Sequence, residues 1–389
     1  MKMRVKLGDV CNFYAGTGFP VAYQGKDSGE LPFYKVGDIA NNVSVGKTYL
    51  ELCNNYISKE DARAIKGVIV PKGTVVFAKI GEALKLNRRA ITSCDCLIDN
   101  NAMGIAPISD FLKEKYFFYY MKHLKMQELA ESTTVPSVRK SKLEKTVIEV
   151  PSILEQQRIE KELDKISDIV SMRKQQLQQL DELVKARFVE LFGDPMTNSK
   201  EYPLKKYGDL FELNAGGTPS KQKPEYWDNG TISWIGSNMC QNSVIYENDG
   251  NYITEEGFNH SSARMFPVDT VLIALVGATI GKTALLKFET TTNQNVLGVR
   301  GIRESGFTPE FVFYYTQGLY QKFLDIGDGG FAMASKGFIS ELPIPIVDLS
   351  RQNEFADFVE QVNKSKFVVQ KALNEAQTLF DSLMQEYFG

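Results

Sequence analysis

The chain has 389 residues, of which 43% are hydrophobic and 24% charged, and its formal net charge is −3. This composition is ordinary for a globular protein of two or three domains. We expect a cytoplasmic protein, because no apolar stretch reaches the roughly 18 residues that a membrane span needs and the N-terminus has no apolar signal segment. The five cysteines follow no disulfide pattern, which favours reduced thiols. Only residues 1–150 lean basic, with 22 Lys and Arg against 16 Asp and Glu.

Short strands and loops are expected in the first 150 residues. The apolar runs 68–70 and 75–78 are bounded by Gly and Pro, which is typical of strands. A short helix then carries Phe118, Tyr119 and Tyr120. We interpret these aromatic side chains as part of the hydrophobic core and not as a surface for stacking bases. The equivalent aromatic residues in the second half of the chain have no basic residues between them.

A long amphipathic helix is predicted after Pro151. Hydrophobic residues recur at alternating spacings of four and three from Ile159 to Leu191, which indicates a coiled-coil seam. Two arginines stand at seam positions, where their stems can pack while their heads reach water. Gly193 and Pro195 then end the helix. Its roughly 38 residues would span about 57 Å at 1.5 Å per residue.

The second half of the chain repeats the first. Segment 71–81 recurs as 267–277 and segment 101–105 recurs as 295–299, in the same order and at nearly the same offset. Adding 196 to the seam positions of the first helix gives a second seam, from Phe355 to Tyr387, in the same phase. We therefore predict two copies of one module, each followed by a helix. The short linker 193–200 leads us to expect that the two helices pack antiparallel.

Segment 277–283, GATIGKT, imitates a phosphate-binding loop after the apolar run 271–276. Such a loop needs four residues between its first Gly and the Gly-Lys-Thr, and this segment has three. The equivalent segment 81–86 has no Gly-Lys-Thr. We therefore favour a tight turn or a DNA-backbone contact over nucleotide binding.

Most enzyme chemistries find no support in the sequence. The chain has only two histidines, His123 and His260, and no Cys-x-x-Cys pair, which argues against a zinc site. Hydrolase and metalloprotease motifs are also missing. We expect no catalytic, cofactor or metal site in this chain.

Several segments together resemble a known family. In the second half these are 213–221 (LNAGGTPSK), 224–227 (PEYW), 232–235 (ISWI) and 269–282. The junctions 150–158 and 343–352 lead from each module into its helix. These segments look like those of the DNA-specificity subunit of type I restriction–modification enzymes. In the first half the match is weaker, since 15–20 only partly follows the Gly-Gly-Thr-Pro pattern.

The resemblance implies an α+β fold with two α/β target recognition domains and two long helices in an antiparallel coiled coil. The corresponding boundaries are 1–150 and 195–347 for the domains, and 151–194 and 348–389 for the spacer helices. Each domain would read one half of an asymmetric bipartite DNA site. The resemblance also implies that the helices dock two methyltransferase subunits, which carry S-adenosylmethionine, and that a restriction and translocase subunit joins the complex.

Polar and basic loop residues are the candidates for DNA contact, because base edges need donors and acceptors and phosphates need positive charge. In the first module these are Lys79, Lys85, Asn87, Arg88, Arg89, Arg139 and Lys140. In the second module they are Thr218, Ser220, Lys221, Lys223, Lys282, Asn293, Gln294 and Lys336. The adjacent arginines Arg88 and Arg89 are the strongest pair, since they follow a basic loop.

Two alternatives remain open at the level of sequence. A coiled-coil scaffold would explain the repeat and the helices but not the recognition-domain segments. A nucleotide-binding enzyme would rest on 277–283 alone.

Overall fold

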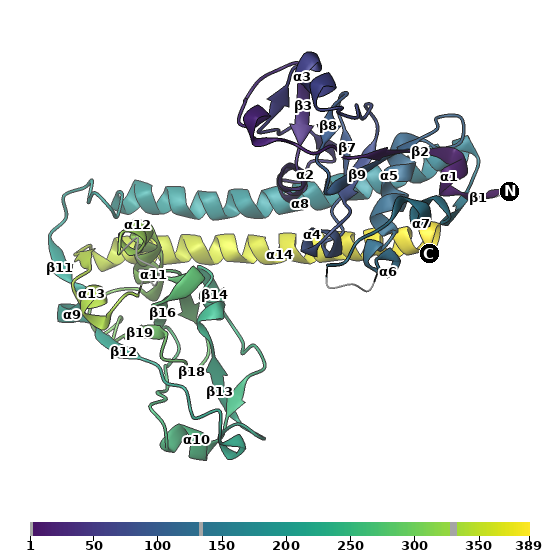
Figure 1. The fold of residues 1–389 in the computed structure, drawn as a ribbon. Coiled ribbons are helices and arrows are strands. Elements are labelled where there is room, and N and C mark those ends of the chain that lie inside the picture. The colour runs from purple at the N-terminus through teal and green to yellow at the C-terminus, as the bar shows by residue number, and fades with distance from the viewer. Residues whose placement is uncertain (1–2, 132–134, 327–332) are drawn as a thin grey trace. The chain divides into compact units, whose positions relative to one another are not determined.

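The computed structural model describes residues 3–131, 135–326 and 333–389. Two compact units divide the chain: residues 1–175 with 370–389 form unit 1, and residues 176–369 form unit 2 (Figure 1). Each unit therefore contains one module together with a part of each long helix.

The module of unit 1 is built from short elements. They are β1 (Met3–Lys6), α1 (Leu7–Val10), β2 (Cys11–Ala15), η1 (Val21–Tyr23), β3 (Leu31–Tyr34), α2 (Val36–Ser44), β4 (Tyr49–Leu50), β5 (Tyr56–Ile57), α3 (Lys59–Ala64), β6 (Val75–Ala78), α4 (Glu82–Lys85), β7 (Ala90–Thr92), β8 (Leu97–Ile98), β9 (Ala102–Pro107), α5 (Glu114–His123), α6 (Met126–Leu129), α7 (Lys140–Glu144) and β10 (Val147–Val150). The helix α8 (Ile153–Phe192) follows.

The module of unit 2 has corresponding elements. They are β11 (Leu204–Lys206), α9 (Tyr207–Leu210), β12 (Glu212–Ala215), η2 (Pro224–Tyr226), β13 (Ile232–Ile235), η3 (Ser237–Met239), β14 (Ser243–Ile245), β15 (Tyr252–Ile253), α10 (Glu255–Asn259), β16 (Val271–Ala274), η4 (Gly277–Thr279), β17 (Thr283–Leu286), β18 (Thr291–Thr292), β19 (Val296–Arg300), α11 (Pro309–Gly318), α12 (Tyr320–Leu324), α13 (Lys336–Ser340) and β20 (Pro343–Pro345). The helix α14 (Leu349–Phe388) completes the described chain.

The sheets of the two modules have the same topology. Five strands follow the order β2-β9-β6-β7-β4 in the first module and β12-β19-β16-β17-β14 in the second. A three-stranded sheet, β5-β3-β8 or β15-β13-β18, and a two-stranded sheet, β1-β10 or β11-β20, accompany each. Even the parallel pairs correspond, since β4–β7 and β3–β8 match β14–β17 and β13–β18. The predicted duplication is confirmed.

The predicted strand at 68–70 is wrong. Only Val70 forms a bridge, with Cys96, whereas Val68 donates its backbone N–H to the hydroxyl of Thr17 at 3.0 Å. Val68 and Ile69 are exposed. The apolar run is thus a connection here, because only Val70 pairs with another backbone segment and the N–H of Val68 goes to a side chain. The predicted strand at 75–78 corresponds to β6, and the apolar run 271–276 contains β16.

The aromatic helices α5 and α11 belong to the cores, as predicted. Tyr119 and Tyr120 of α5 are buried, as are Phe313 and Tyr315 of α11. Helix α11 begins with Thr308, whose side chain caps the N–H of Phe311, followed by proline at the first helical position.

The helices α8 and α14 are 40 residues long each and lie side by side within both units. In unit 2, Arg187 pairs with Glu354 at 2.5 Å, and Asp181 pairs with Lys366. From the first pair to the second, the residue number decreases along α8 and increases along α14. The two helices are therefore antiparallel in unit 2.

Each module core is completed by a helix end that comes from elsewhere in the chain. In unit 1, Phe380 and Met384 of α14 join the cluster that contains Tyr119 of α5. In unit 2, Phe188 and Phe192 of α8 pack against α11. The apolar seam therefore serves both helix pairing and module packing.

Candidate nucleic-acid interface

Two loops of the second module meet at the Gly-Gly-Thr-Pro segment. The N–H of Gly217 donates to the carbonyl of Thr292 at 2.8 Å, and the hydroxyl of Thr218 donates to the side chain of Gln294. A Cβ on Gly216 would clash with the backbone of Thr292. The glycines therefore allow the close approach that brings Thr218 beside Gln294 and the neighbouring Asn293.

Both tryptophans of the chain support this pair of loops. The indole of Trp234 donates to the carbonyl of Gly217 at 3.1 Å, and the indole of Trp227 donates to the carbonyl of Ser220 at 3.2 Å. The rings meet edge to face at 5.2 Å. Ser220 and Lys221 stay exposed on the loop that the tryptophans hold. An anchored loop with exposed donors suits readout of a base edge.

Lys282 lies in a hairpin and not in a phosphate-binding loop. Segment 277–283 joins β16 to β17, which are antiparallel neighbours, whereas a phosphate loop leads from a strand into a helix. The N–H of Gly281 returns to the carbonyl of Ala274 at 2.8 Å, and the ammonium of Lys282 donates to Gln241 at 3.0 Å.

Two further basic candidates of the second module lie outside this hairpin in the chain. Lys336 is exposed in the first turn of α13. Lys223 donates to the hydroxyl of Tyr226 at 2.8 Å and lies 4.6 Å from the centre of its ring.

Three basic candidates of the first module lie together. The N–H of Val138 donates to the carbonyl of Lys79 at 2.9 Å, which places Lys79 beside Arg139 and Lys140. Arg139 pairs with Glu131 at 2.8 Å and Lys140 with Glu144 at 3.5 Å. Both basic residues are exposed, so these ion pairs are weak and can be exchanged for phosphates.

Arg88 and Arg89, the strongest pair of candidates in the sequence, differ in their surroundings. Arg89 is only 3% exposed and lies against Phe77, with its guanidinium 4.9 Å from the ring centre. It donates to the side chain of Asn87 at 2.6 Å, and burial lowers the pKa of Arg89 to about 9. Arg88 is partly exposed. Lys85, one helix turn away, pairs with Glu82 at 2.7 Å.

Sequence reasoning missed the residues that support these loops. Gln241 accepts a hydrogen bond from Lys282, and the two tryptophans donate hydrogen bonds to the backbone of the Thr218 loop. A signal for the tryptophans was present, because the only two in the chain fall within eight residues of one another in the segment after Gly-Gly-Thr-Pro.

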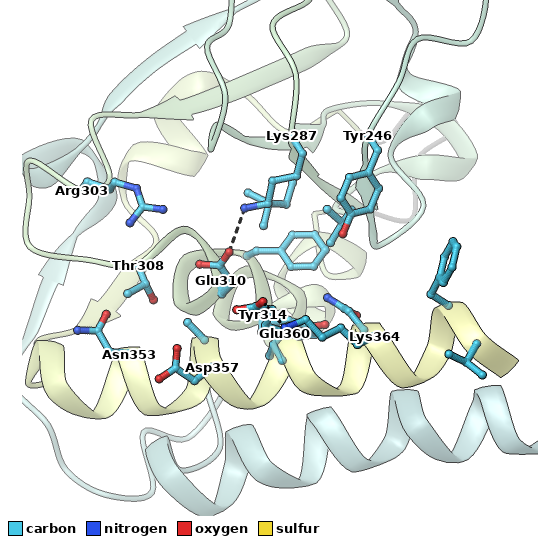
Figure 2. A pocket seen from close by; sticks show the side chains of 18 residues that line it. Tyr246, Lys287, Arg303, Thr308, Glu310, Tyr314, Asn353, Asp357, Glu360 and Lys364 are labelled. Carbon is cyan, nitrogen blue, oxygen red and sulfur yellow. Dashed lines mark hydrogen bonds and ion pairs between the residues drawn. The ribbon is translucent and has the colours of Figure 1, made fainter. Parts of the chain in front are cut away.

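A cavity of about 710 Å³ in unit 2 lies between α11, the β14–β17 edge and α14 (Figure 2). Most of its charged side chains are paired. Lys287 donates to Asp269 at 2.8 Å and to Glu310 at 3.0 Å, Arg303 donates to Asp269 at 2.6 Å, and Lys364 pairs with Glu360. Burial would raise the pKa of Asp269, but the hydrogen bonds from Lys287 and Arg303 outweigh it and lower that pKa.

A metal site would need several His, Cys, Asp or Glu side chains close together in the parts of the chain that the structure describes. No group of three His, Cys, Asp or Glu residues there could hold a metal ion. Burial raises the pKa of Cys11 and of Cys240 to about 12, which keeps both thiols protonated. Across residues 3–131, 135–326 and 333–389, no helix has the length and apolar character of a membrane span.

The family is defined by the sequence match together with this fold. The sequence model of the type I restriction modification DNA specificity domain matches twice, at residues 2–182 and 199–376. The chain belongs to this family.

Two curated relatives match parts of the chain. The specificity subunit of type I restriction enzyme EcoR124I/EcoR124II of Escherichia coli is 33% identical over 113 residues, 28% of either chain. The MjaIX specificity subunit of Methanocaldococcus jannaschii is 30% identical over 184 residues, 44% of this chain and 42% of that protein. The matched regions thus span well under half of these relatives.

Solved structures share the fold over the full length. The type I restriction–modification S subunit of M. genitalium aligns with 100% of this chain and 96% of its own, with a TM-score of 0.55 and 14% identity. A chain from a structural study of assembly and conformational transition of the type I system aligns with 100% and 97%, with a TM-score of 0.57 and 15% identity.

Proposed function

We propose that this protein is the DNA-specificity subunit of a cytoplasmic type I restriction–modification complex. One observation carries the proposal: two modules of identical topology present different loop residues. Thr218 and Gln294 meet in the second module, whereas the first module has Gly18 and Asn100 at the corresponding offsets. Two modules that share one backbone topology but present different side chains suit the recognition of an asymmetric bipartite site.

The proposed DNA contacts are exposed or partly exposed side chains on loops and short helices of each module. In the second module these are Thr218, Ser220, Lys221, Lys223, Lys282, Asn293, Gln294 and Lys336. In the first module they are Lys79, Lys85, Arg88, Arg139 and Lys140, with Asn87 and Arg89 holding the Arg88 loop. Basic residues would engage phosphates, and the Thr218–Gln294 pair would face base edges.

The helices would dock the partner subunits. Exposed apolar side chains stand on both, with Met172 of α8 58% exposed and Phe367 of α14 73% exposed. Such residues favour burial against another protein. We propose that two methyltransferase subunits bind there and bring S-adenosylmethionine, that a restriction and translocase subunit joins them, and that this chain has no catalytic role.

Sequencing the methylated bases of a host that carries this chain with its methyltransferase tests the proposal. We expect one asymmetric sequence in two parts separated by a fixed gap. Thr218→Ala combined with Gln294→Ala should relax one part only and leave the other part intact. Methylation of an unbroken site, or relaxation of both parts together, would refute the assignment of one half-site to each module.

A further inference from the structure

A second cavity, of about 330 Å³, lies in unit 1 between the first module and both long helices. Five cationic side chains line it, and we call it the basic pocket: Lys47, Arg88, Arg89, Lys122 and Lys174. Neutral donors complete the wall, from Asn87, Ser167, Ser171 and Gln377. No Asp or Glu belongs to its lining among the residues that the structure describes.

Arg89 is the buried cation of the basic pocket. Its side chain is 3% exposed, two of its nitrogens donate to neutral oxygens of Arg88 and Asn87, and its Nε has no partner in the described structure. A buried guanidinium without a carboxylate is costly unless an anion compensates it. The ring of Phe77 supplies only a weak substitute.

Lys122 and Lys174 bring further positive charge to the same wall. The ammonium of Lys122 lies 5.6 Å from the ring centre of Phe118 and 5.2 Å from that of Phe380. Desolvation lowers the pKa of Lys122, and the charge of Lys174 lowers it further, while Asp381 opposes the shift. Of the five cations, Lys47 has a carboxylate partner, Glu51.

The fold does not require these cations, because the second module lacks most of them. Ala90 and Ala284 hold the same register in β7 and β17, so Arg88 and Arg89 correspond to Lys282 and Thr283. By strand and helix offsets, Lys47, Lys122 and Lys174 correspond to Asn242, Gln317 and Gln370. In the second module, Thr283 bonds Asn242 at 2.9 Å through its N–H, and no buried cation arises.

We propose that the basic pocket binds a small phosphate anion, inorganic phosphate or pyrophosphate. A planar guanidinium, two ammonium groups and two serine hydroxyls supply the donors that phosphoryl oxygens accept. The volume lies at the small end of ligand-sized cavities. The pocket is walled by the module and by both helices, and Arg89 is almost fully covered, so a DNA duplex does not reach this guanidinium. Arg88 belongs both to this lining and to the proposed DNA contacts, but the inference does not rest on the proposed DNA function.

Titration calorimetry of the full-length chain with pyrophosphate tests the proposal. We expect saturable binding by the wild type and at least tenfold weaker binding by Lys122→Gln combined with Lys174→Gln. These substitutions introduce the residues found at the corresponding positions of the second repeat, Gln317 of α11 and Gln370 of α14. Lys161→Gln combined with Lys165→Gln removes the same charge from α8 outside the pocket lining and should leave the affinity unchanged. Thermal unfolding of each variant checks that the chain stays folded.

Three results would overturn the proposal. One is a wild type that shows no saturable binding of pyrophosphate or phosphate. Another is an equal loss of affinity in both double variants, which would mean diffuse attraction. The third is loss of duplex affinity in the Lys122 and Lys174 variant without any pyrophosphate binding by the wild type, which would make DNA the occupant.

Discussion

Gln156 and Gln352, which lie 196 positions apart, make the same three hydrogen bonds in the two units. The side-chain oxygen of Gln352 accepts the N–H of Thr308 at 2.9 Å, and that of Gln156 accepts the N–H of Lys113 at 2.8 Å. The amide of each then donates to two backbone carbonyls. Both glutamines are fully buried, so each one joins the start of a long helix to the loop before its aromatic helix.

Gln156→Leu and Gln352→Leu should therefore each destabilise the protein. Every buried backbone group that loses its partner costs roughly 1–3 kcal/mol, so the loss of stability should be at least that large. Urea unfolding measures it. Gln157→Leu, at an exposed neighbouring position, is the control and should change stability by about 0.5 kcal/mol or less. Equal effects at positions 156 and 157 would contradict the bonding role.

Arg88→Ala and Arg89→Ala should have different consequences. Loss of the partly exposed Arg88 should weaken DNA binding and reduce the salt slope by about one unit, if its contact is a phosphate. Loss of the buried Arg89 should lower the unfolding midpoint, because it empties space beside Phe77 and frees Asn87. Salt-dependent binding to the target duplex and thermal unfolding separate the two effects. An unchanged midpoint for Arg89→Ala would contradict its structural role.

Lys282→Ala should leave nucleotide binding unchanged. Its loop is a hairpin in which Lys282 reaches Gln241, so it encloses no triphosphate. Fluorescence titration with labelled ATP should give the same curve for wild type and variant, while affinity for duplex DNA decreases. Saturable ATP binding that disappears in Lys282→Ala would restore the phosphate-loop interpretation.

Asp269→Asn should lower stability at neutral pH and less so in acid. The net lowering of the pKa of Asp269 by Lys287 and Arg303 means that its stabilisation is present above the unfolded-state pKa of about 3.9 and is lost as pH falls through the folded value. The difference between wild type and variant should be about 1–2 kcal/mol at pH 7 and should shrink below about pH 4. Urea unfolding across pH measures it. A difference that stays constant with pH would mean that the carboxylate charge is not the cause.

Matched four-residue insertions after Gln176 and after Gln370 test the helices as a spacer. Each position lies one residue beyond a boundary between the two compact units, which divide after Gln175 and after Val369. Four residues add about 6 Å of helix, under two base pairs of DNA, and rotate one end by about 40°. On the proposed function, both half-sites should persist while the gap lengthens by one or two base pairs. Methylome sequencing reads the gap, and altered half-sites with an unchanged gap would count against the spacer role.

Periodic features of the sequence predicted the fold well. The heptad seam predicted the two long helices, because it depends on local spacing. The repeated segments predicted two equivalent modules, because they recur in the same order at nearly the same offset. The boundaries proposed for the four segments stay a prediction, since each compact unit takes residues from both helices.

The remaining features depend on contacts that are distant in sequence. The sequence predicted a strand at 68–70, because no local pattern shows that the hydroxyl of Thr17 accepts a hydrogen bond from the N–H of Val68. The sequence predicted that Arg89 lies on the surface, because charged side chains are usually exposed. Only the tertiary structure places Phe77 against its guanidinium. Which candidate residues touch DNA stays a prediction.

The order in which the two cores close follows from the helix ends that complete them. Phe188 and Phe192 precede the second module, so they have left the ribosome before the core that they join is made. Phe380 and Met384, which finish the first module, are synthesised only after the whole second module. While the second module is being made, the first module therefore lacks the cover that α14 gives to α5, and its exposure to chaperones and proteases during synthesis lasts longer than that of the second module.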